Sequence, residues 1–406
     1  MVLYSLTFFL ALFSAGLPAG LYSIIWNQMS EKLTLAVPYV SLLRAMIAAG
    51  AVIACILCGR QPEKKERNLD LCLAGVSLET LGVVGLSLSR VFWNLMVWSF
   101  VLGLGYGMSL TLICMAAVRL SGRSIMLQFS GASAGILSGA WILMSAEDAS
   151  GSWRTGCQVL ALVQVIIIGS VFLIRRALLK GGDVRKKLEE RSREAARERE
   201  RQRKLRHPDR EDLEQAERQF MTKALFSCFA AFAGTLLVFC LVLWPQSFRV
   251  ASTGADMEMT GLGVVMTGLG LAAGRIAAAL CRPERNRLQI GAMALMAVLL
   301  LLEQYLIAEN GLTDMGLLIF QLLTGAAAGP VFPSLLLLDD VRLDREAEGD
   351  LLALLPAFAL GSWIVITPLT QALVGGGQTE HFPVWLLLIT VVTGFFLFLS
   401  SRGEKD

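Results

Sequence analysis

A densely charged segment, residues 175–222, separates two long apolar regions, 1–174 and 223–406. From Arg175 to Lys223 the chain holds 17 of its 36 Lys and Arg residues and 11 of its 33 acidic residues. The whole chain is 55% hydrophobic and only 17% charged, which is far more apolar than a soluble domain. This pattern predicts two membrane-embedded bundles that are joined by a charged cytoplasmic linker.

Each apolar region divides into six runs of the roughly 20 residues that a helix needs to cross a bilayer. The runs are apolar on all sides, which favours membrane helices over the one-sided helices of a soluble core. The sequence therefore predicts an all-α membrane protein with twelve transmembrane helices in two bundles. The predicted spans lie near 3–26, 37–58, 69–89, 92–117, 125–144, 156–174, 223–244, 259–281, 288–308, 313–337, 351–375 and 382–400.

The basic residues predict the orientation, because cytoplasmic loops carry an excess of Lys and Arg. If both termini are cytoplasmic, the inside segments hold 30 basic residues and the outside loops hold four, which are Lys32, Arg90, Arg154 and Arg249. We expect a monomeric, multi-pass protein of the cell membrane with both termini inside. The net charge of +3 does not indicate a nucleic-acid partner, since the charge concentrates in the linker.

The linker is rich in Glu, Arg, Lys and Ala from Val184 to Arg206, which predicts a helix that ends before Pro208. Two interpretations of it stay open. Its basic face could contact lipid headgroups, or it could be a solvated tether between the bundles. We favour the tether, because acidic residues are interleaved throughout.

Six predicted spans, a basic linker and six further spans resemble the architecture of the major facilitator superfamily, and several stretches of the sequence resemble it as well. GLPAGLYSIIW in the first span is similar to the opening of its fucose-permease-like bacterial branch, with Ala19 where an Asp is usual. LGLAAGRIAAALCRPERNR in span 8 and TGAAAGPVFPS in span 10 resemble the second half of such carriers. The resemblance implies alternating access, in which two six-helix halves rock around a central site for a small solute. It also implies that spans 1, 4, 7 and 10 line the cavity.

Away from the span ends, four charged residues lie within the predicted spans. A charge at such a position needs a structural or functional explanation, because the bilayer disfavours it. Arg44 is expected to be a gate or substrate-binding residue, or to form a structural ion pair with Glu79. That ion pair is the favoured interpretation of Glu79. Arg275 is expected either to face the cavity and bind substrate or to reach the cytoplasmic surface. Glu303 is expected to belong to the scaffold.

Glu79 is also the candidate for proton coupling. Sugar–proton symporters of the resembled branch use acidic residues in spans 1 and 4, and neither of these predicted spans contains Asp or Glu. The coupling of the branch therefore does not transfer to this chain. Either Glu79 substitutes, or the carrier is uncoupled, or it no longer transports.

Polar and aromatic side chains in the predicted spans could line a substrate site. The combination of an apolar aromatic lining with a few polar groups suits a sugar-like or amphipathic neutral solute. The candidates, besides Arg44 and Arg275, are Tyr106, Gln128, Thr235, Gln321 and Trp363. We predict no cofactor and no metal, since the eight cysteines are scattered singly or in one close pair and only two histidines exist.

Glycines repeat at four-residue spacing in two predicted spans, at Gly131, Gly135 and Gly139 and at Gly103 and Gly107. Small residues at this spacing let two membrane helices approach closely. This pattern predicts a tightly packed bundle and says nothing about the substrate.

Two other functional classes compete with a transporter. The first is a non-transporting receptor or scaffold of carrier fold, which the missing acidic residues favour. The second is a membrane enzyme, suggested by the acidic cluster of Asp339, Asp340 and Asp344. A diphosphate-binding enzyme would need a second acidic motif, and the matching loop has only Arg119 and Arg123. We therefore expect no enzymatic activity.

Overall fold

Apolar helices make up nearly all of the chain that the structure describes. The structure is a computed structural model that describes residues 2–35, 39–59, 65–117, 121–180, 222–242, 257–281, 285–309, 311–336, 354–365, 368, 372 and 381–401. The helices are α1 (Val2–Gly16), α2 (Leu21–Ile24), α3 (Trp26–Leu33), α4 (Tyr39–Gly59), α5 (Lys65–Leu88), α6 (Phe92–Ala117), α7 (Gly122–Ser150), α8 (Trp153–Lys180), α11 (Met257–Cys281), α12 (Arg285–Ala308), α13 (Asp314–Ala328), α14 (Val331–Leu335) and α16 (Phe382–Ser401). Two unlabelled helices, Thr222–Val242 and Leu354–Val365, complete the described set.

Eleven helices in the described ranges are long and apolar enough to cross a membrane, and Leu354–Val365 is a shorter apolar helix. They follow the order of the twelve predicted spans, which confirms the predicted all-α membrane fold. α8 continues to Lys180, past the predicted start of the linker at 175, and Arg175 pairs with Asp70 of α5. The predicted linker helix lies outside the described residues.

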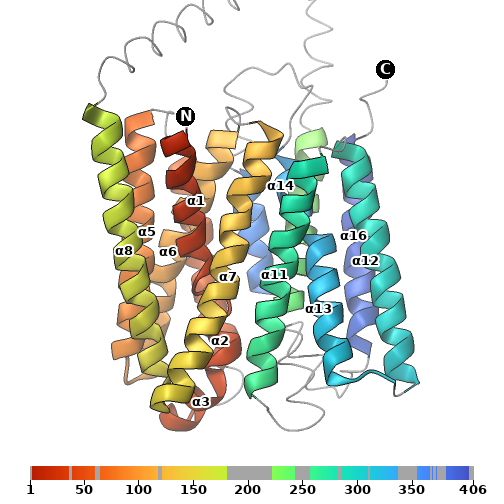
Figure 1. The fold of residues 1–406 in the computed structure, drawn as a ribbon, viewed down its shortest axis with the longest axis horizontal. Coiled ribbons are helices and arrows are strands. Elements are labelled where there is room, and N and C mark those ends of the chain that lie inside the picture. Colours follow the sequence, from red (N-terminus) through yellow and green to blue (C-terminus); the bar gives the residue numbers. More distant parts are fainter. Residues whose placement is uncertain are drawn as a thin grey trace, which may run out of the picture.

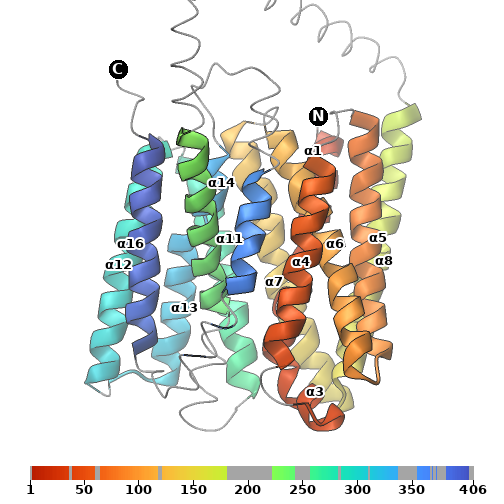
Figure 2. The same cartoon turned by 180° about the vertical axis from the view of Figure 1, so that it is seen from behind.

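The helices form two groups that lie side by side (Figure 1). We call α1 to α8 the N-terminal group and the helices from Thr222 onward the C-terminal group. α7 and α11 run beside each other where the groups meet, and the reverse view shows the same boundary (Figure 2). The start of α1 and the end of α16 lie on one side of the molecule, which we call the terminal side.

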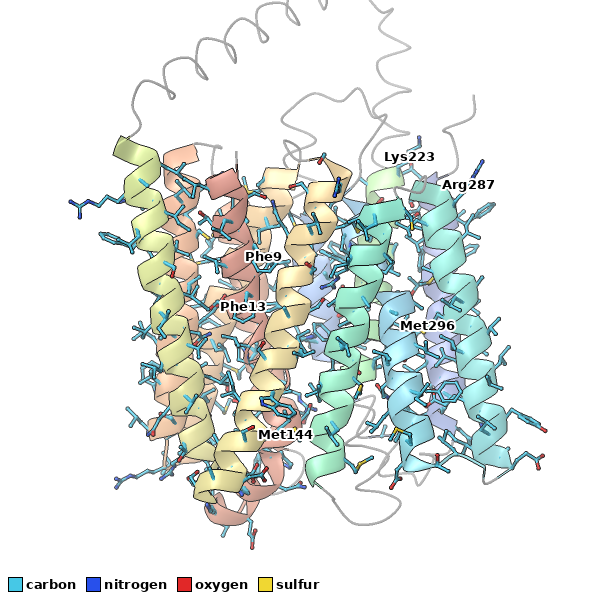
Figure 3. The ribbon with its side chains drawn as sticks, in the orientation of Figure 1. Phe9, Phe13, Met144, Lys223, Arg287 and Met296 are labelled. Atoms are coloured by element: carbon cyan, nitrogen blue, oxygen red, sulfur yellow. The ribbon has the colours of Figure 1, made fainter. Side chains whose placement is uncertain are left out.

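The glycine stripe of α7 packs directly on the backbone of α1. A Cβ atom at Gly139 would lie 1.9 Å from the carbonyl oxygen of Leu17, and one at Gly135 would lie 2.2 Å from that of Phe13. Phe13 and Phe9 lie where α1 and α7 meet (Figure 3). The close approach predicted from the glycine spacing is confirmed, because no larger side chain leaves room for these carbonyl groups.

Two further helix contacts depend on glycine in the same way. On α6, Cβ atoms at Gly103 and Gly107 would lie 2.0 and 2.2 Å from carbonyl oxygens of α4. On α11, Cβ atoms at Gly270 and Gly274 would lie 2.1 and 2.0 Å from carbonyl oxygens of α13. The tight packing therefore extends through both groups.

Proline interrupts two of the spans. The first span breaks between α1 and α2, where Pro18 has no N–H to donate to the Ser14 carbonyl four residues earlier. The tenth span breaks between α13 and α14, at Gly329 and Pro330, and Pro333 in α14 leaves the Gly329 carbonyl without the N–H donor four residues later. Both carbonyl groups are thereby open to side chains from other helices.

Candidate functional site

A polar network surrounds Glu79 in the middle of the N-terminal group. Ser14 of α1 donates to one carboxylate oxygen of Glu79 at 2.6 Å, and Ser109 of α6 donates to the other at 2.8 Å. Gln164 of α8 donates through Nε2 to Ser14 Oγ at 3.3 Å. All four side chains are fully buried. We call Ser14, Glu79, Ser109 and Gln164 the Glu79 network.

The break in the first span helps to build this network. Because Pro18 cannot donate to the Ser14 carbonyl, that carbonyl keeps only the Leu17 N–H as a backbone donor, at 3.2 Å, and also accepts from Gln164 Nε2, at 3.3 Å. Gln164 therefore holds both oxygens of Ser14, and Ser14 in turn orients the carboxylate. Ser14 and Gln164 were not among the predicted site residues, although Pro18, four residues after Ser14, indicates that the Ser14 carbonyl lacks one helical donor.

Glycines allow α5 and α6 to pack closely around the Glu79 network. A Cβ atom at Gly105 would lie 2.5 Å from the backbone nitrogen of Glu79 and 2.7 Å from its Cγ. A Cβ atom at Gly75 would lie 3.0 Å from Ser109 Oγ. The carboxyl group is thus enclosed by two close-packed helices.

The predicted ion pair between Arg44 and Glu79 is wrong. Both carboxylate oxygens of Glu79 accept from serine hydroxyl groups, and Arg44 donates to Ser23 Oγ of α2 at 3.3 Å. The spacing of the two charges along the sequence could not reveal this, because the two serines come from α1 and α6. Within the described residues, Glu79 is a buried carboxyl group without a cationic partner.

Arg275 joins the two groups of helices. It is 7% exposed, so it does not reach the surface. Its Nε donates to the Gly329 carbonyl of its own group at 2.9 Å. Its Nη1 donates to the Phe129 carbonyl at 2.5 Å and to Ser133 Oγ at 2.6 Å, both on α7 of the other group.

Aromatic rings also meet across the boundary. Tyr106 of α6 stacks on Trp363 of the helix Leu354–Val365, with ring centroids 5.7 Å apart and planes inclined by 23°. Phe239 of the helix Thr222–Val242 meets the same Trp363 edge-to-face at 4.3 Å. Tyr106 and Phe239 come from predicted spans 4 and 7, which the family resemblance assigns to the cavity, and Trp363 comes from predicted span 11. They form an aromatic cluster between the groups.

The remaining candidates lie within a single group. Gln128 donates through Nε2 to Ser5 Oγ of α1 at 2.9 Å, and Gln321 accepts from Thr267 Oγ1 of α11 at 2.9 Å. Thr235 has an enclosed hydroxyl group without a hydrogen-bond partner among the described residues. The structure therefore brings Arg275, Tyr106 and Trp363 to the boundary and leaves Gln128 and Gln321 in helix contacts.

The alternative enzymatic site is not described by the structure. The acidic cluster of Asp339, Asp340 and Asp344 lies outside the described residues. Within the ranges given above, no group of three or more His, Cys, Asp or Glu side chains could hold a metal ion.

Comparison with known proteins places the chain among membrane carriers. The family model of the Major Facilitator Superfamily matches residues 8–368, which is most of the chain. Among solved structures, the fold is similar to that of the proton:xylose symporter XylE bound to 6-bromo-6-deoxy-D-glucose, with a TM-score of 0.71 and 14% sequence identity. The similarity covers 98% of this chain and 95% of the symporter. No curated protein matches the sequence.

Proposed function

Since the chain belongs to the Major Facilitator Superfamily, we propose that this secondary transporter carries a small organic solute across the cell membrane by alternating access. In this mechanism the N-terminal and C-terminal groups rock against each other around a site between them. The observation that carries the proposal is the aromatic contact of Tyr106 with Trp363, because it joins the two groups at their boundary. The superfamily membership predicted from the sequence motifs is confirmed; the fucose-permease-like branch stays a prediction.

The chemistry at the boundary favours a sugar-like or amphipathic neutral solute. Aromatic faces bind the apolar face of such a molecule, and a few polar groups orient it. Nε and Nη1 of Arg275 donate to three neutral acceptors within the protein, so these N–H groups are not free to bind a solute. The fold similarity to a proton:xylose symporter agrees with this class of solute.

The transport activity is tested with the purified protein in liposomes. We would first screen sugars, nucleosides and amphipathic compounds for thermal stabilisation and then measure the uptake of those that bind. Uptake above that of empty liposomes supports the proposal. Ligands that stabilise the protein but never cross the membrane would instead support the receptor hypothesis, which the absence of acidic residues in predicted spans 1 and 4 favours.

Trp363 is expected to contribute to solute binding. In the Trp363→Ala variant, uptake at low solute concentration should fall by about tenfold, because an aromatic contact of this kind contributes up to about 1.5 kcal/mol beyond its buried area. Trp363→Phe should keep most of the activity. Trp141→Ala is the matched control, since Trp141 is 59% exposed on α7. Equal uptake by the Trp363→Ala and Trp141→Ala proteins would contradict the proposed site.

The proposed orientation can be tested with the native cysteines. Cys281 ends α11 on the terminal side and is exposed, whereas the other seven cysteines are buried. A membrane-impermeant thiol reagent added to intact cells should leave Cys281 unlabelled and label it after the membrane is opened. In a C281S background, a cysteine at Ser150, at the opposite end of the molecule, should react in intact cells. The reverse pattern would contradict cytoplasmic termini.

A further inference from the structure

The side of α11 that faces α7 has an unusual composition. Gly261, Gly268 and Arg275 follow one another at seven-residue intervals, a spacing that keeps residues along one seam between two packed helices. A Cβ atom at Gly261 would lie 2.2 Å from Met144 Sδ, and one at Gly268 would lie 2.9 Å from the Leu137 backbone nitrogen. Arg275 is thus the only one of these three seam positions that bears a side chain.

The type of contact between α7 and α11 differs between the two ends of this seam. Met144 lies near the end of α7 that is remote from the terminal side (Figure 3), where the contact with Gly261 is made by a flexible thioether. Arg275 lies six residues before the end of α11, on the terminal side, where the contact with α7 is made by charged hydrogen bonds. The terminal side is therefore held by the stronger type of interaction.

The C-terminal group keeps Arg275 in place through the break in the tenth span. Pro333 cannot donate to the Gly329 carbonyl, and Arg275 Nε supplies the missing hydrogen bond at 2.9 Å. The adjacent Gly274 lets α11 lie against the Ala326 carbonyl, to which a Cβ atom would approach within 2.0 Å. Gly274 and Arg275 of α11 thus form one structural unit with Gly329 and Pro333 of the tenth span.

The N-terminal group supplies the other acceptors. The Phe129 carbonyl and Ser133 Oγ both accept from Arg275 Nη1, at 2.5 and 2.6 Å. The guanidinium carbon lies 5.8 Å from the centroid of the Phe129 ring, and Phe332 of α14 meets that ring edge-to-face at 5.6 Å. Arg275 is buried and its charge lies over the Phe129 ring, so these hydrogen bonds form in a region of low dielectric constant where they are strong.

We propose that Arg275, with Gly329 on one side and Phe129 and Ser133 on the other, is a latch that holds the terminal side of the protein closed. Opening of that side breaks the two bonds to α7 and keeps the bond to Gly329, so Arg275 moves with the C-terminal group. Among the described residues, the Gly261 end of the seam has no comparable polar contact between the two groups, so the resting protein favours closure at the terminal side. The proposal rests on alternating access as the proposed function.

The latch is tested by a distance measurement without any solute. Spin labels are attached to the native Cys281 and to a cysteine at Arg123, an exposed position in the first turn of α7. In the Arg275→Met variant, the ratio of long-distance to short-distance populations should rise by about tenfold or more, because a hydrogen bond to a charged group corresponds to at least about that factor in an equilibrium constant. Ser133→Ala should shift the ratio in the same direction by a smaller factor.

Arg154→Met is the matched control, because Arg154 also donates to a backbone carbonyl, that of Ser89, but within the N-terminal group. It should leave the distances unchanged. Ser133→Ala removes one acceptor of Arg275 and leaves the sequence of α11 unchanged. This variant therefore tests the latch even if the Arg275→Met protein fails to fold. A Ser133→Ala protein with the unmodified distance distribution would overturn the latch.

The outcome is independent of the transport test. A protein that moves no solute in liposomes can still open when Ser133 is replaced, which would refute transport and keep the latch. A protein that transports with unchanged distances in both variants would keep transport and refute the latch.

Discussion

A Gly139→Leu variant is expected to yield almost no folded protein. The new Cβ atom would lie 1.9 Å from the Leu17 carbonyl oxygen and 2.7 Å from its carbonyl carbon, and both are backbone atoms that cannot rotate away. Overpacking costs about 1–3 kcal/mol where side chains can adjust. Here α1 itself would have to move off α7, so the destabilisation should exceed about 3 kcal/mol, a large fraction of the stability of a typical protein.

The matched control is Gly169→Leu, on α8. It makes the same chemical change, also within a long apolar helix, but no atom lies within 4 Å of the new Cβ position. Since glycine in a helix is less favourable than leucine by about 0.5–1 kcal/mol, this variant should be as stable as the parent or slightly more stable. Size-exclusion yield and the melting temperature in detergent measure both. Similar melting of the two variants would contradict the contact between α1 and α7.

The membrane fold was predictable because composition alone decides it. Runs of about 20 apolar residues can satisfy their backbone only as helices in a bilayer. The glycine spacing in α7 also predicted a tight contact, and Gly135 and Gly139 make one. The sequence did not reveal that the partner is α1, because a small-residue stripe carries no information about which helix fills it.

The site was less predictable, because its key acceptors are backbone carbonyl groups. Arg275 was recognised as unusual for its charge, but its partners Gly329 and Phe129 contribute only main-chain oxygen. Residue-type patterns do not reveal such acceptors. The useful signal was the proline four residues after Gly329 and likewise four residues after Ser14, since each proline leaves one carbonyl without its helical donor.

We propose that Glu79 carries the coupled proton, and Glu79→Gln is expected to abolish accumulation of solute driven by a pH gradient. A gradient of one pH unit supplies about 1.4 kcal/mol per proton, which supports about tenfold accumulation. This tenfold accumulation should disappear in the variant, because an amide cannot bind and release a proton. Exchange of solute across the membrane without a gradient should continue, since glutamine has nearly the same size.

The network around Glu79 makes this expectation specific. Intramembrane carboxyl groups that face the bundle interior are typical members of proton relays. Both oxygens of Glu79 are held by serine hydroxyl groups, which can donate to a carboxylate and accept from a carboxylic acid, so Ser14 and Ser109 suit either protonation state. An amide offers one acceptor and one donor, so it keeps both hydrogen bonds after one serine hydroxyl rotates.

Glu303→Gln is the control for this prediction, because Glu303 is an equally buried carboxyl group on α12 of the C-terminal group. It should retain gradient-driven accumulation if coupling resides in the Glu79 network. Loss of accumulation in both variants would indicate a general effect of removing intramembrane charge. Unchanged accumulation in Glu79→Gln would show that the proton, if one is carried, binds elsewhere. The comparison therefore separates coupling at Glu79 from a structural role. Loss of coupling abolishes gradient-driven accumulation and leaves solute exchange, whereas a structural defect reduces both.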